Sequence, residues 1–264
     1  MIELKSEQER AHMRAAGQVV AEVLDILRQA VVPGLATLEL DRLAEAEIRK
    51  RGALPVFKGY QAYQGQPPYP GTVCVSVNEQ VVHGIPGARK LRPGDLVSLD
   101  LGARVAGFVG DAALSVFVGT PPNETAARLL SITAASLEAG IAAVTIGGHV
   151  GDIGAAVQEV VERAGFSVIR DFVGHGVGRS MHEDPQVPNY GTHGLGPRIR
   201  PGMAIAIEPM VAEGDYAVRV LPDGWTAVTK DGSRACHFEH TIFVGEEGVE
   251  VLTRLSQEPI HEVQ

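Results

Sequence analysis

The sequence predicts a mixed α/β protein in which two similar halves share one sheet. Residues 97–117 alternate apolar and polar side chains, the period-two pattern of β-strands. A helix–turn–helix plan also occurs twice, and its glycines match at an offset of 113 positions: Gly34 corresponds to Gly147, and Gly52 corresponds to Gly165. Two related halves around one sheet would leave a cleft between them, where ligand sites are commonly built.

Composition limits the function classes. The 264 residues are 45% hydrophobic, enough for a sizeable core. The net charge of -9, with no basic cluster longer than residues 49–51, argues against nucleic acid or an anionic membrane as the main partner. Cys74 and Cys236 are the only cysteines, so a reducing compartment is favoured. The charged start and the absence of a transmembrane-length apolar run predict a cytoplasmic protein.

Two helices open the first half. Ser6 and Glu9 form an S-x-x-E capping box, and apolar residues follow at helical spacing as far as Leu27. A second helix is expected from about Thr37 to Gly52, with a basic last turn.

The second half repeats this plan with a helix from Asn123 to about residue 143 and another over residues 151–164. We therefore predict a single catalytic domain, residues 1–264, with pseudo-repeat halves of about 1–120 and 121–264.

The strands at 97–117 carry the first candidate site. A turn centred between Val105 and Ala106 would place Asp100 directly opposite Asp111 in a half-buried hairpin. Burying two facing carboxylates costs several kcal/mol unless something compensates, and a multivalent cation is the obvious compensation. The pair alone equally permits two solvated surface aspartates.

Three later segments read as strands that bring further polar groups. They are residues 166–173, which lead into Gly174-His175-Gly176, residues 204–209, which end in Glu208 and Pro209, and residues 237–244. In the last of these, His237 and Glu239 share one face. A lone carboxylate at a strand end is usually a cap or a surface group, but several together with an imidazole indicate a metal site.

Five motifs occur in order along nearly the whole chain: V-V-H-G-I-P-G, D-L-x9-D, G-H-G-V-G-R-x-M-H-E-D-P-Q-V-P-N-Y, A-I-E-P-M and F-E-H-T-I. Together they resemble the methionine aminopeptidases of the bacterial, type I class. The resemblance implies the pita-bread fold, with a curved antiparallel sheet and helices on its outer face. It also implies removal of the initiator methionine from nascent chains when the second residue is small, through a hydroxide shared by two metal ions.

The resemblance also implies roles for individual residues. The metal ligands would be Asp100, Asp111, His175, Glu208 and Glu239, with Asp111 and Glu239 bridging the two ions. Glu208 would be the general base. His182 would stabilise the developing oxyanion, and His83 would contact the peptide nitrogen.

The specificity pocket is expected to be walled by Phe57, Tyr60, Tyr69, Cys74, Met181 and Trp225. Here the chain departs from the family pattern, because the segment between Tyr60 and Cys74 is longer than usual and Gln61 stands where many members carry a histidine.

Three rival functions were weighed. A proline-specific aminopeptidase of this fold would use similar metals but normally carries an extra N-terminal domain, and a creatinase-like hydrolase would lack the five-ligand set. A catalytically inactive binding protein is expected to have lost ligands, and none is lost here. The cofactors expected are two divalent ions, drawn from Mn, Fe, Co or Zn. The expected partners are the N-termini of nascent polypeptides at the ribosome. The protein itself is expected to be a monomer.

Overall fold

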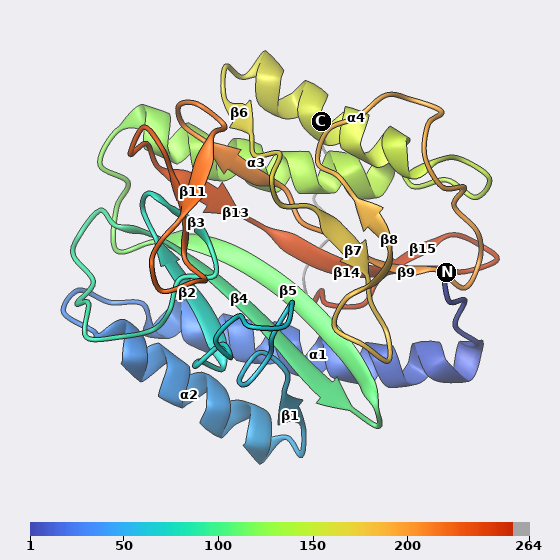
Figure 1. The fold of residues 1–264 in the computed structure, drawn as a ribbon, viewed down its shortest axis with the longest axis horizontal. Coiled ribbons are helices and arrows are strands. Elements are labelled where there is room, and N and C mark those ends of the chain that lie inside the picture. The colour runs from blue at the N-terminus through green and yellow to red at the C-terminus, as the bar shows by residue number, and fades with distance from the viewer. Residues whose placement is uncertain (256–264) are drawn as a thin grey trace.

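The computed structural model describes residues 1–255 and is built around one curved sheet of nine strands. Its order is β1–β4–β5–β14–β9–β7–β8, with β2 beside β4 and β15 beside β14. Every named strand pair in the described part of the chain is antiparallel, as predicted. Figure 1 shows α1 and α2 along the bottom of the view and α3 and α4 along the top, with the strands between them.

The four predicted helices are present. They are α1 (Glu7–Ala30), α2 (Thr37–Lys50), α3 (Glu124–Ala142) and α4 (Val150–Arg163). The capping box of α1 is confirmed, because the Ser6 hydroxyl accepts from the Glu9 N–H and the Glu9 carboxylate accepts from the Ser6 N–H. None of the helices within residues 1–255 combines the length and the apolar character needed to cross a membrane.

The strands are short except for one central hairpin. Their bounds are β1 (Leu54–Pro55), β2 (Val73–Val77), β3 (Gln80–Val82), β4 (Leu96–Val105), β5 (Phe108–Phe117), β6 (Ser167–Val168), β7 (Gly174–Gly176), β8 (Glu183–Val187), β9 (Ala204–Ile207), β10 (Met210–Ala212), β11 (Val218–Val220), β12 (Ala227–Thr229), β13 (Ala235–His237), β14 (Glu239–Val244) and β15 (Val249–Val251). Two three-stranded sheets, β13–β10–β6 and β11–β12–β3, accompany the main sheet.

The predicted register of the β4–β5 hairpin was wrong by two residues. Asp100 pairs with Ala113, and Asp111 pairs with Gly102. The cause is the turn, in which Ala106 and Gly107 both have positive φ and form a two-residue connection that pairs Val105 with Phe108. A slip of two residues keeps every side chain on its original face, so both aspartates still project from the same side of the hairpin.

The hairpin is more buried than the expected half-buried one, since most side chains on both faces of β4 are buried. The odd-numbered residues Val97, Leu99 and Leu101 pack in one core cluster with apolar side chains of α1 and α2. The other face, which carries Asp100, lines a cleft. The helices therefore bury one face of the sheet and leave the opposite face to the polar groups.

The local geometry repeats at the offset seen in the sequence. Gly34 and Gly147 have φ values of 87° and 85°, and their N–H groups donate to Leu91 and Ile199 carbonyls respectively. The N-termini of α2 and α4 are capped in the same way. The Glu39 carboxylate accepts from the Ala36 N–H, and the Asp152 carboxylate accepts from the His149 N–H. These parallels support the interpretation of two related halves, which stays a prediction.

Two predicted strands differ from the structure. Within residues 166–173 only Ser167 and Val168 form a strand, which pairs with β10 and not with the main sheet. Phe166 is buried in a cluster with residues of α3 and α4. Residues 237–244 are divided at Phe238, since β13 pairs with β10 while β14 belongs to the main sheet. The break still leaves His237 and Glu239 close to the cleft.

Candidate active site

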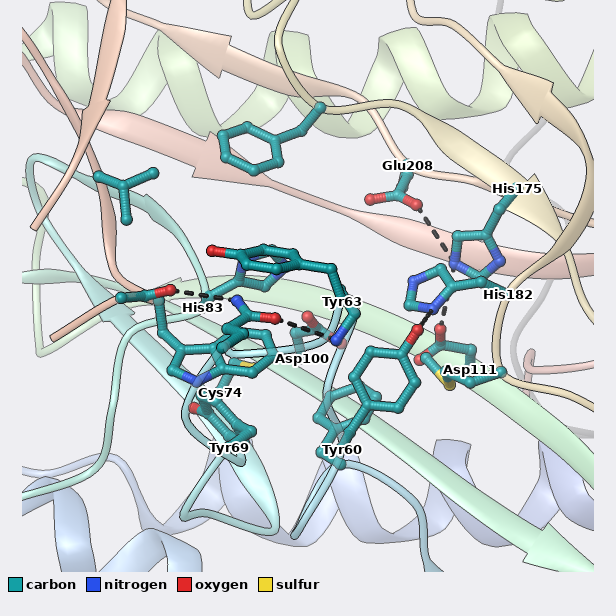
Figure 2. Close-up of a pocket in the computed structure, with 18 of the residues that line it drawn as sticks. Tyr60, Tyr63, Tyr69, Cys74, His83, Asp100, Asp111, His175, His182 and Glu208 are labelled. Carbon is teal, nitrogen blue, oxygen red and sulfur yellow. Dashed lines mark hydrogen bonds and ion pairs between the residues drawn. The ribbon is translucent and has the colours of Figure 1, made fainter.

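One cleft of about 460 Å³ contains all the site residues named from the sequence. Figure 2 shows the carboxylate and histidine cluster on the right, around Glu208, His175 and Asp111, and a mainly apolar region on the left, around Cys74 and Tyr69. Their common location does not by itself test their roles. The predicted residues lining the cleft are Phe57, Tyr60, Tyr69, Cys74, His83, Asp100, Asp111, His175, Met181, His182, Glu208, Trp225 and Glu239.

Three neighbouring strands of the sheet bring three carboxylates together. Ala113 on β5 pairs with Asp100 on β4 and with Glu239 on β14, so these two carboxylates flank the same position. Asp111 lies two residues away on β5, on the same face. Glu208 follows the last residue of β9, immediately before Pro209.

His175 faces this cluster from β7. Its Nε2 lies 3.5 Å from Glu208 Oε1 and 3.6 Å from Asp111 Oδ2. Its Nδ1 lies 2.9 Å from the Gly176 carbonyl oxygen, a partner that can only accept, so Nδ1 carries the proton and Nε2 presents a lone pair to the carboxylates.

The glycines on both sides of His175 are required by close packing. A Cβ at Gly174 would collide with the Ala206 carbonyl oxygen, and one at Gly176 would collide with that of Asp184. The strand β7 is therefore held tightly between β8 and β9, which fixes where the imidazole projects.

The donor set fits divalent cations. One ligand atom each from Asp111, His175 and Glu239 lies within 4.8 Å of the others. Asp100 Oδ1, Asp111 Oδ1 and Glu239 Oε1 are buried without a hydrogen-bond partner. No lysine or arginine is among the described residues that line the cleft. Buried carboxylate oxygens with neither a donor nor a counter-charge are what a bound cation would satisfy.

The pKa values of these groups have the same cause. Burial raises the pKa of Asp100 to about 7, against a hydrogen bond from the Cys74 thiol that acts in the opposite direction. Burial, followed by the charges of the neighbouring carboxylates, raises the pKa values of Asp111, Glu208 and Glu239 well above their usual range. Without a cation the four groups therefore resist ionising together.

Two further histidines stand beside the cluster. His182 accepts or donates a 2.6 Å hydrogen bond through Nδ1 with the Tyr60 hydroxyl, and its ring centre lies 4.3 Å from that of His175. His83 has a positive φ of 60°, an uncommon conformation for a residue of its size. Its ring meets Phe172 and Trp225 edge-on, and burial lowers its pKa to about 4.

The apolar end of the cleft is rigidly built. The Tyr69 and Trp225 rings meet edge-on with centres 5.2 Å apart. The Tyr69 hydroxyl donates to the Gly84 carbonyl at 2.9 Å, and the Trp225 indole N–H donates to the Pro67 carbonyl at 2.7 Å. The Tyr69 hydroxyl and the Trp225 N–H both have backbone hydrogen-bond partners, so the two rings form an apolar wall of the cleft.

Sequence reasoning did not assign several residues that are found here. His237 Nε2 is buried without a hydrogen-bond partner, 3.7 Å from Glu208 Oε2, and the shared face with Glu239 was the available signal for it. Phe172, Gln66, Tyr63 and Val220 also line the cleft. No motif marked them, and two of them lie in the segment that is longer than the family pattern.

Comparisons with known proteins agree with this geometry. The metallopeptidase family M24 matches residues 11–246. The chain is 46% identical over 255 residues to methionine aminopeptidase 1 of Bacillus subtilis (strain 168), covering 97% of this chain and 100% of the relative. It is 47% identical to a methionine aminopeptidase of Clostridium perfringens (strain 13 / Type A), covering 96% and 99%.

Solved structures give the same picture. The crystal structure of methionine aminopeptidase from Thermotoga maritima superposes with a TM-score of 0.91 at 48% identity, covering 96% of this chain and 100% of that one. The prolidase from Pyrococcus furiosus superposes with a TM-score of 0.75 at 19% identity and is covered to 66%, so it shares the fold alone. The pita-bread architecture expected from the sequence is confirmed.

Proposed function

The chain belongs to metallopeptidase family M24, and we propose that it removes the N-terminal methionine from polypeptides whose second residue is small, using two divalent metal ions. The observation that carries this proposal is the convergence of four carboxylates and one imidazole on the floor of an apolar cleft, with buried oxygens that have no other partner.

The metal-binding residues would be Asp100, Asp111, His175, Glu208 and Glu239. Four ionised carboxylates carry four negative charges, which two divalent cations would balance. The family resemblance implies that Asp111 and Glu239 would each bind both ions. The ions, when bound, would supply Lewis-acid polarisation of the scissile carbonyl and a lowered pKa for the attacking water.

Glu208 would act as the general base that takes the proton of that water. Its Oε1 and Oε2 lie 3.5 Å from His175 Nε2 and 3.7 Å from His237 Nε2. A carboxylate in this position would accept a proton from water and return it to the departing peptide nitrogen.

His182 would stabilise negative charge on the carbonyl oxygen. When the Tyr60 hydroxyl donates to Nδ1, the ring proton resides on Nε2, which can then donate to a developing oxyanion. His83, held between Phe172 and Trp225, would contact the scissile peptide nitrogen.

The apolar end of the cleft would bind the methionine side chain. Phe57, Tyr69, Cys74 and Trp225 are buried members of one apolar cluster, which Tyr60 joins from its edge. An unbranched thioether fits such walls, whereas a charged side chain would lose its hydration without gaining a partner.

The test compares kcat/KM for Met-Ala-Ser, Leu-Ala-Ser and Met-Leu-Ser after reconstitution of the metal-free protein with single divalent metals. We expect leucine to be released roughly 10 to 200 times more slowly than methionine, since a methylene changes binding in an apolar pocket by only about 1 to 3 kcal/mol. A bulky second residue should lower the rate by misplacing the carbonyl. Equal rates for the three peptides would identify a broad aminopeptidase instead.

The same proposal covers the biological setting. The substrates are the N-termini of nascent chains, and the enzyme acts on them as a monomer. Mn, Fe, Co and Zn all suit one imidazole with four carboxylates. Reconstitution with each metal, followed by sedimentation of the active form, tests these points.

A further inference from the structure

Two exposed apolar side chains lie at the mouth of the cleft. Tyr63 is 64% exposed and Val220 is 52% exposed, and both line the same cavity as the carboxylates. Figure 2 draws Tyr63 across this cavity together with His83 and Asp100. Apolar groups of this size at the rim of a binding cleft indicate a contact that forms only when a ligand enters.

The segment that carries Tyr63 is firmly attached. Gln66 is buried, donates to the Gly224 carbonyl at 3.1 Å and accepts from the Ala62 N–H at 3.0 Å. The indole of Trp225 donates to the Pro67 carbonyl. These bonds join residues 62–67 to the turn that precedes Trp225, so Tyr63 is presented from the Trp225 side of the cleft.

Val220 approaches from the same side. It pairs with Ala227, two residues after Trp225, and it belongs to β11, which pairs within the described chain with β12 alone. The extra residues after Tyr60 and the β11 edge therefore frame one part of the cleft mouth, next to the wall assigned to the methionine side chain.

The direction of an extended substrate connects this part of the mouth to a particular residue. Side chains alternate along an extended chain, so the third residue projects to the same side as the first, about 6.6 Å further along. With the first side chain against Trp225, a substrate that leaves through this part of the mouth would bring its third side chain to Tyr63 and Val220.

We propose that Tyr63 and Val220 form an apolar clamp for the third residue of the substrate, which makes the enzyme prefer polypeptides with an apolar third residue. This inference rests on the proposed methionine-releasing function and adds a specificity element to it.

The test compares kcat/KM for Met-Ala-Leu-Ser and Met-Ala-Ser-Ser. Partial burial of a leucine side chain against the clamp should favour the leucine peptide about five- to tenfold in the unmodified protein. Tyr63→Ser and Val220→Ser should each lower this ratio toward one. Tyr63→Phe should keep it, because it retains the ring and loses only the hydroxyl. Leu195→Ser is the matched control, since Leu195 is 61% exposed but does not line the cleft, and it should keep the full ratio.

Equal rates for the two peptides in the unmodified protein would overturn the clamp, and so would a preference that survives both serine substitutions. A metal-loaded protein that cleaves neither peptide would instead overturn the proposed function itself, and the clamp with it.

Discussion

Asp111 is central to the cluster at the level of single residues. Its Oδ2 lies 3.6 Å from His175 Nε2, and its Oδ1 is buried without a partner. Asparagine has nearly the same size as aspartate but no charge. Replacing Asp111 by asparagine therefore distinguishes a role in metal binding from a role in packing.

Asp111→Asn should weaken metal binding by more than about 100-fold and abolish nearly all turnover. Residues that only hydrogen-bond to a metal ligand typically cost less metal affinity than this when they are substituted. Elemental analysis of the purified variant and Met-Ala-Ser cleavage measure the two effects. Asp25→Asn, on the helix surface, is the matched control. Full activity in a protein shown to be metal-free would refute the metal-dependent mechanism.

His83→Ala should lower kcat by roughly 10² to 10⁴, the range for losing a positioned polarising or proton-transfer group, while the metal content stays unchanged. The exposed His193 provides the control substitution. If the His83 variant loses metal in proportion to activity, then His83 is a ligand and its assigned role is wrong.

At the level of secondary structure, elements with local signals were predictable and those set by distant packing were not. The Ser6 capping box and the turn glycines Gly34 and Gly147 marked helix boundaries correctly. The hairpin register depended on positive φ at Ala106, which a sequence pattern does not reveal because alanine rarely adopts it. The apolar residues after Phe166 predicted a strand as far as Val173, but only Ser167 and Val168 form one, and it pairs in a small sheet with β10.

The site shows the same division. The candidate site residues taken from the five motifs all line one cleft, because each of them lies on a strand or close to the end of one. Tyr63, Gln66 and Val220 could not be found this way. They depend on how residues 62–67 dock onto the turn before Trp225, a contact between segments 158 positions apart.

Ser6→Ala should destabilise the protein by about 1 kcal/mol, since it removes the acceptor for the first-turn N–H of α1. In a chain of this length that corresponds to a fall in Tm of roughly 2 to 4 °C. Thermal unfolding measures the shift, and Met-Ala-Ser cleavage at 25 °C should be unaffected. Ser131→Ala, away from a helix start, is the control. An unchanged Tm would show that the capping box contributes nothing.

For the molecule as a whole, two sets of buried groups make stability depend on pH in opposite directions. Asp100, whose pKa is about 7, and its neighbouring carboxyl groups hold protons in the folded state that the unfolded chain has released. That stabilisation is lost as pH rises through the folded pKa values. Buried histidines such as His175 and His237, with pKa values lowered to about 3 by desolvation, stabilise the fold as pH rises toward 6.5 and contribute no change above it.

The metal-free protein should therefore become less stable between about pH 6.5 and pH 8.5. Asp100 alone contributes about 1 kcal/mol across this range, because most of its effect falls at lower pH. Chemical denaturation in excess chelator measures the change. Asp100→Asn should reduce it, and saturating divalent metal should cancel it. A metal-free protein that gains stability over this interval would contradict the pKa assignment.

The first helix also determines the order in which the fold can be completed. The Leu252 carbonyl oxygen lies directly against Gly17, Gln18 donates to Leu252 and Arg254, and Arg14 pairs with Glu250. These partners are 234 to 236 positions apart along the chain. Contacts between residues so far apart in the sequence form late in folding. Closing such a long loop costs conformational entropy before the contacts stabilise it. During synthesis, α1 therefore stays incompletely covered until residues near 250 have been made.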